Sequence, residues 1–251
     1  MAPGAEAAPA AAIGSGLRRR QAWARPGSGR ARACLWGAAA GLCLLGGVAF
    51  LEAAAPGPIT HMMAAHILLM NAVAPLIALA IAGRAASLVP AVRSAASLGA
   101  ATVLQLALIG ALHVPGAIAA ALADPIVHFL MQGALLAAAL WFWLAVLATR
   151  AGQRWRSLLA LAVTAKLFCL LGALLVFAPR LLLAGLDSAH TPHGTEASLA
   201  DQQLAGLLML AACPLTYVLA GIVLAATWLG ELSAGGAQGD RRDPAAAMRL
   251  G

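Results

Sequence analysis

Apolar residues fall in six long, continuous runs, at about 34–51, 61–83, 96–114, 125–148, 157–179 and 201–230. Each run is long enough, at roughly 20 residues, for a helix to cross about 30 Å of hydrocarbon. Inside a bilayer only helices and closed barrels satisfy their own backbone groups, and barrel strands would alternate polar and apolar residues. The pattern therefore predicts an all-α, polytopic transmembrane bundle with about six spanning helices.

Local signals mark some helix ends. Asp124 can cap the first free amides of the fourth run, and Pro125 suits the first helical position. Pro75 and Pro214 lie inside their runs and predict kinks there. The first run has a second interpretation, a late signal peptide cleaved near 53–55, although its length favours a retained helix. Cleavage would leave the topology downstream unchanged.

Composition supports a membrane domain without a soluble one. The chain is 62% apolar and only 10% charged, whereas soluble domains carry about 25% charged residues. We expect residues 34–230 to form the membrane domain. The segments 1–33 and 231–251 are polar, or rich in Ala, Gly and Pro, and are predicted to be disordered tails.

The basic residues set the expected orientation. With the N-terminus inside, fourteen of the sixteen basic residues fall on the cytoplasmic side, as the positive-inside rule requires. Both termini are therefore predicted to be cytoplasmic, in a bacterial-type plasma (inner) membrane. The arginines cluster between apolar runs and form no extended basic surface, so we expect no nucleic-acid partner.

This orientation places all six histidines on the non-cytoplasmic side. His66 and His128 are each one to two turns inside their helices, about 6–8 Å below the helix starts, and are expected at one depth. His61 and His113 lie at helix ends, and the remaining two, His190 and His193, are more typical of an ordinary outer loop. Ionisable residues within a span are costly and tend to be functional.

Soft donor atoms accompany these imidazoles. Met62, His66 and Met70 are spaced i, i+4, i+8 and form one helical stripe. Two further groups lie on other runs: Asp124, His128 and Gln132, and Asp201, Met209 and Cys213. Imidazole with thioether and thiol suits Cu(I), while imidazole with carboxylate also suits zinc. The alternative is structural, because such residues also form hydrogen bonds between helices and fill gaps.

Several segments resemble CtaG-like cytochrome c oxidase assembly proteins over about 55–230. They are HMMAAHILLM at 61–70 before APL at 74–76, DPIVHF at 124–129, WFW at 141–143, FAPR at 177–180 and DQQLAGLLM at 201–209. Three features depart from the family pattern: the first two histidines are five apart instead of four, Leu210 stands where a Trp is typical, and six spans are expected instead of seven.

The resemblance implies a plasma-membrane factor that helps to build a haem–copper oxidase, with His61, His66, His128 and Asp201 as functional residues. Together with the Met62 and Met70 stripe, these residues form the predicted copper site. The implied partners are oxidase subunits, a periplasmic copper chaperone and the lipid bilayer. Two other functions stay open: an intramembrane b-type haem protein with paired histidine ligands, and a metal-free scaffold for oxidase subunits. No nucleophile–base pair or phosphate loop is evident, so we expect no enzyme.

Overall fold

The computed structural model describes residues 27–54, 57–88, 95–182 and 198–241, and within these ranges the chain is helical, without a strand. Five helices are long and apolar enough to cross a membrane, and a sixth span is completed by two shorter helices that meet at an angle of 74°. The prediction of an all-α bundle with about six spans is confirmed.

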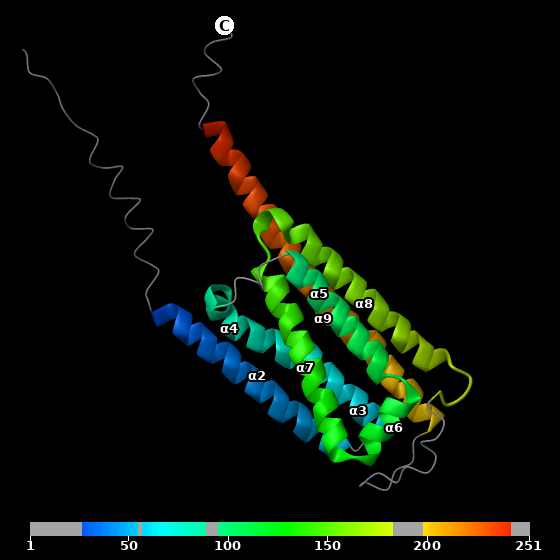
Figure 1. The fold of residues 1–251 in the computed structure, drawn as a ribbon. Coiled ribbons are helices and arrows are strands. Elements are labelled where there is room, and N and C mark those ends of the chain that lie inside the picture. Colours follow the sequence, from blue (N-terminus) through cyan, green and yellow to red (C-terminus); the bar gives the residue numbers. More distant parts are fainter. Residues whose placement is uncertain (1–26, 55–56, 89–94, 183–197, 242–251) are drawn as a thin grey trace, which may run out of the picture.

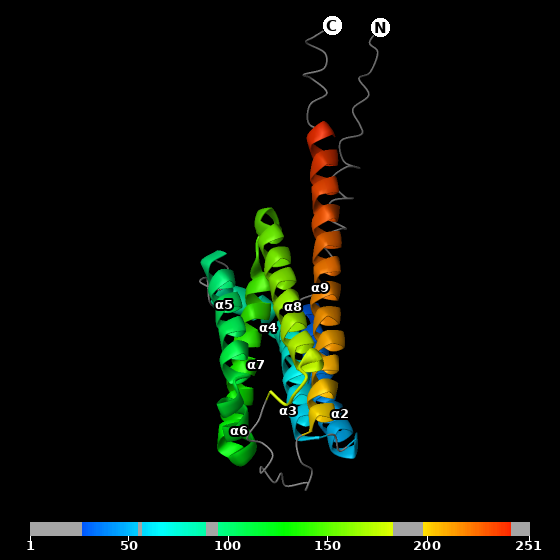
Figure 2. The same ribbon diagram turned by 90° about the vertical axis from the view of Figure 1, so that its right-hand side faces the viewer.

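The elements follow one another with short connections. They are α2 (Gly27–Ala54), α3 (Pro58–Ile67), the π-helix η1 (Leu68–Val73), α4 (Ala74–Leu88), α5 (Ala95–Leu112), α6 (Pro115–Ala123), α7 (Pro125–Ala148), the 3₁₀ turn η3 (Ala151–Gln153), α8 (Arg154–Phe177) and α9 (Leu199–Arg241). Successive spans run in opposite directions, and α8 and α9 lie side by side (Figures 1 and 2). We call the end of the bundle where α2 ends and α3, α7 and α9 begin the distal end.

The fourth predicted run matches its helix at both ends. Helix α7 spans Pro125–Ala148, and the Asp124 carboxylate accepts a hydrogen bond from the Ile126 amide at 2.8 Å, as the cap prediction requires. The third run is different, because α5 stops at Leu112 and the separate helix α6 follows it after a sharp bend. Pro115 starts α6 at a position where a missing amide costs nothing.

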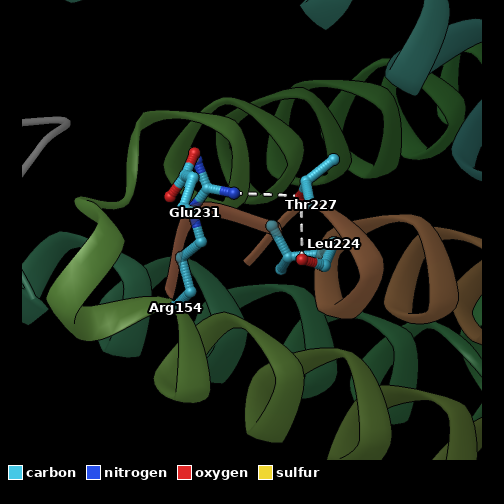
Figure 3. A network of polar contacts seen from close by, with 4 residues as sticks. All are labelled: Arg154, Leu224, Thr227 and Glu231. Atoms are coloured by element: carbon cyan, nitrogen blue, oxygen red, sulfur yellow. Dashed lines mark hydrogen bonds and ion pairs between the residues drawn. The ribbon is translucent and has the colours of Figure 1, made fainter. Parts of the chain in front are cut away.

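Helix α9 continues beyond the predicted end at residue 230, so residues 231–241 are helical instead of a disordered tail. Arg154 supplies a physical reason, because its guanidinium forms a 2.8 Å ion pair with Glu231 and donates to Thr227 Oγ1 at 3.0 Å (Figure 3). These contacts hold the extension of α9 against the start of α8. Helix α2 likewise begins at Gly27, earlier than the predicted residue 34.

Two glycines let α8 and α9 approach closely. A Cβ atom on Gly206 would lie 2.8 Å from the carbonyl oxygen of Gly172, and one on Gly172 would lie 3.0 Å from that of Gly206. Small residues at such crossings allow tight backbone packing in membranes, where no hydrophobic force drives helices together. This crossing fixes the level of the distal half of α9.

Several predictions fall outside the described residues. These are the tail segments 1–26 and 242–251 and the outer loop with His190 and His193. The orientation of the bundle relative to the cytoplasm stays a prediction.

Candidate functional site

A small enclosed cavity lies in the distal half of the bundle, between α3, η1, the end of α5, α8 and α9. Its volume is about 20 Å³, which is room for one water-sized group. The residues that line it are mostly metal-donor types: His66, His113, Met63, Met70, Met209 and Cys213, with Asn71, Ile67, Ile109 and Phe168 completing the wall. We call this space the donor cavity.

Both histidines of the donor cavity are held in the same way. The Nδ1 atom of His66 bonds the carbonyl oxygen of Met62, and Nδ1 of His113 bonds that of Ile109 at 2.7 Å. A neutral imidazole that donates from Nδ1 carries its lone pair on Nε2. Such a hydrogen bond to a backbone carbonyl is the usual way in which proteins orient a metal-binding histidine. The two rings lie side by side, with centroids 5.8 Å apart.

Sulfur atoms lie next to these nitrogens. The Nε2 atom of His113 is 3.2 Å from Sδ of Met63, which joins α5 to α3. Met209 and Cys213 are one helical turn apart on α9 and approach the cavity from the opposite wall. Thioether, thiol and neutral imidazole donors together match the preferences of Cu(I).

The π-helix η1 places Met70 and Asn71 at the cavity wall, and Pro75 explains one of its contacts. In this register the Leu69 carbonyl accepts from the Ala74 amide, so the Met70 carbonyl would need the amide that Pro75 lacks. The indole of Trp143 donates to this carbonyl instead, at 3.0 Å. π-turns of this kind occur often at functional sites.

An aromatic cluster packs beneath the cavity. Tyr217 stacks on Trp143 with centroids 5.4 Å apart, and Phe142 and Phe168 meet it edge-on. The hydroxyl of Tyr217 is buried and accepts a 3.0 Å hydrogen bond from Gln105. The cluster joins α5, α7, α8 and α9 and gives the cavity a rigid floor.

The Asp201-Gln202 pair holds helix ends in place. The Asp201 carboxylate accepts hydrogen bonds from the amides of Ile59 and Thr60, at 2.9 and 3.1 Å, and so caps α3 from a different helix. Gln202 accepts from the Leu182 amide at 2.8 Å and donates to the Leu175 carbonyl at 3.2 Å. Together they tie the start of α9 to α3 and α8, which positions Met209 two turns further along.

The structure divides the predicted copper-site residues into three groups. His66 and Met70 line the donor cavity. His61 and His128 are only partly buried nearer the distal surface, where His61 lies 3.7 Å from Glu52 and His128 lies 3.4 Å from Gln132. Met62 is buried beside the cavity and contributes its carbonyl, and Asp201 is engaged as the α3 cap.

Sequence reasoning missed Met63 as a candidate and did not bring His113 into the site. The spacing of Met63, His66 and Met70 is i, i+3, i+7, which is as good a helical stripe as the one drawn from Met62. Across the described residues no three His, Cys, Asp or Glu side chains are arranged to hold a metal ion. Any ion in the donor cavity therefore depends on its thioethers.

These features define a polytopic helical membrane protein with a buried pocket of soft donors near one end. The family model described as cytochrome c oxidase caa3 assembly factor (Caa3_CtaG) matches residues 12–231, and the chain belongs to this family. Comparison with curated proteins gave no match. Comparison with solved structures gave none either.

Proposed function

We propose that this oxidase assembly factor holds Cu(I) in the donor cavity and passes it to an oxidase subunit. The observation that carries the proposal is the pairing of two tethered imidazoles with three thioethers and a thiol around a space for one small occupant. A soft, monovalent cation suits this set better than zinc, because the carboxylate nearest in sequence pattern, Asp201, is already used by backbone amides. The protein acts by stoichiometric transfer, without turnover.

The partly exposed histidines give the cation a way in. His61 interacts electrostatically with His128, and His66 with both His128 and His113. The four imidazoles thus lead from the distal surface to the donor cavity. With the distal end facing away from the cytoplasm of a bacterial-type plasma membrane, a copper chaperone on that side delivers Cu(I) to His61 and His128.

Cavity size argues against the haem alternative. A volume of about 20 Å³ holds one water-sized group, which is far smaller than a porphyrin. Two larger grooves on the bundle, of about 510 and 540 Å³, are lined by no histidine. A metal-free scaffold remains the second candidate, supported by the family's assembly role.

The test is copper content of the detergent-purified full chain after anaerobic loading with Cu(I). Wild type is expected to retain about one equivalent, and the double variant His66→Ala/His113→Ala to retain little. Met62→Leu is the matched control, because Met62 is as buried as Met63 yet does not line the cavity. Equal copper in wild type and double variant, with the oxidase still co-purifying, would favour the scaffold.

A further inference from the structure

A second, larger space lies directly behind the donor cavity. It is a groove of about 510 Å³ between α2, α3 with η1, and α9, lined mainly by aliphatic side chains. Its walls belong to α2 and α9, the two spans that are least buried within the bundle. We call it the lateral groove.

Asn71 and Ile67 line both spaces, so one residue layer separates the lateral groove from the donor cavity. The Asn71 side chain is only 6% exposed, and neither its amide nitrogen nor its oxygen makes a hydrogen bond within the described residues. It interacts weakly with the Cys213 thiol. A buried amide without partners costs roughly 1–3 kcal/mol, so its placement between two spaces indicates a missing partner.

The lining favours a helix over a lipid chain as the occupant. Gly47, Ala64, Ala72 and Ala212 are small residues on the groove wall, and small residues let helix backbones approach each other in membranes. The hydroxyls of Thr60 and Thr216, also on this wall, are already bonded to backbone carbonyls. Asn71 is the polar group left to be matched, and a hydrocarbon chain offers it nothing.

We propose that the lateral groove receives a transmembrane helix of an oxidase subunit, and that Cu(I) leaves sideways past Asn71 onto a donor side chain of that helix. The inference rests on the proposed function, and the family's assembly role makes an oxidase subunit the partner. Transfer is ligand exchange: one bond to a cavity thioether or imidazole breaks as one bond to a partner donor forms. The copper stays monovalent, so no oxidant or reductant is needed.

Docking is tested by a photo-crosslinking amino acid placed in the full chain in its native membrane. Leu204 lines the groove and Leu207 does not, although the two are similarly exposed at 47% and 53%. Crosslinks to an oxidase subunit are expected from position 204 and not from 207. Equal yields from both positions, or crosslinks from 204 only to lipid or to a second copy of the chain, would overturn the docking site.

Transfer is tested by filling the groove. Ala212→Trp places an indole in the groove, while Ala211→Trp points an identical side chain to the exposed side of α9. Ala212→Trp is expected to bind Cu(I) like wild type but to lower the copper content of the assembled oxidase at least about fivefold. Ala211→Trp is expected to leave it unchanged. Equal oxidase copper in both variants would refute lateral transfer.

A third variant separates a structural role of Asn71 from a role in transfer. Asn71→Leu removes the unsatisfied amide and should leave stability equal or higher, with Cu(I) binding retained and oxidase copper reduced. Normal oxidase copper in this variant contradicts the role given to Asn71. Failure of the proposed function would look different: wild type itself would bind no Cu(I), while the crosslink from position 204 persisted.

Discussion

The Nε2 atom of His113 lies 3.2 Å from the sulfur of Met63, so a nitrogen donor at the end of α5 meets a thioether from the middle of α3. The contact exists because α5 ends at Leu112 and the chain turns sharply into α6. A straight third span would carry His113 onward along the helix. The bend therefore helps to build the donor cavity.

Removing one thioether should weaken copper binding while the fold is kept. Met209→Leu conserves volume and is expected to cost less than about 1.5 kcal/mol of stability. Because Met209 lines the cavity, Cu(I) affinity should fall at least about tenfold, as measured by competition with a chromogenic chelator. Met62→Leu should leave affinity unchanged, and similar losses in both variants would argue against this cavity.

Asp201 is expected to act on stability more than on copper. Asp201→Ala removes the acceptor for two α3 amides and should lower the free energy of unfolding by about 1–2 kcal/mol. Denaturant unfolding in detergent would measure this, alongside copper stoichiometry. Loss of copper with unchanged stability would return Asp201 to the ligand set that the sequence suggested.

The hydrogen bond from Trp143 to the Met70 carbonyl offers a test of the π-turn. Trp143→Phe leaves that buried carbonyl without a donor and should cost about 1–3 kcal/mol. Pro75→Ala restores a backbone amide, so the double variant should lose less than the sum of the two single changes. A double-mutant cycle of unfolding free energies measures this coupling. Strict additivity would mean that Pro75 does not create the need for Trp143.

The α8–α9 crossing should tolerate no Cβ atom at its centre. Gly206→Ala places a methyl group 2.8 Å from a backbone oxygen and should destabilise the protein by about 1–3 kcal/mol. Gly221→Ala, on the same helix with nothing within 4 Å, should be neutral or gain up to about 1 kcal/mol. Thermal unfolding of the two variants provides the comparison, and equal melting temperatures would contradict the close packing.

The sequence could predict which residues enter the membrane, but it could not predict how their faces pair. Asp124 and Pro125 carry a local signal, so the start of α7 was predicted correctly. The cap that Asp201 makes on α3 spans 141–142 residues of sequence and leaves no local trace. The helix faces around the cavity are rich in Ala and Leu on every side, so hydrophobic periodicity does not distinguish a buried face from a lipid-facing one.

The candidate site was predicted in part for the same reason. His66 was singled out because an ionisable side chain within a span is costly, and it lines the cavity. Its expected partner His128 lies nearer the surface, beside Gln132, while His113 takes the adjacent position. Helix starts gave the depth of each residue, but the rotation of each helix and the bend after α5 depend on tertiary packing.

The central claim is that the donor cavity binds Cu(I) through sulfur and nitrogen together. Copper X-ray absorption on the purified full chain, loaded anaerobically with one equivalent of Cu(I), tests it most directly. A mixed shell of sulfur and imidazole nitrogen is expected, with the sulfur contribution reduced in Met63→Leu/Met209→Leu and unchanged in Met62→Leu. A shell of nitrogen and oxygen alone, or sulfur scattering that ignores the double substitution, would contradict the account.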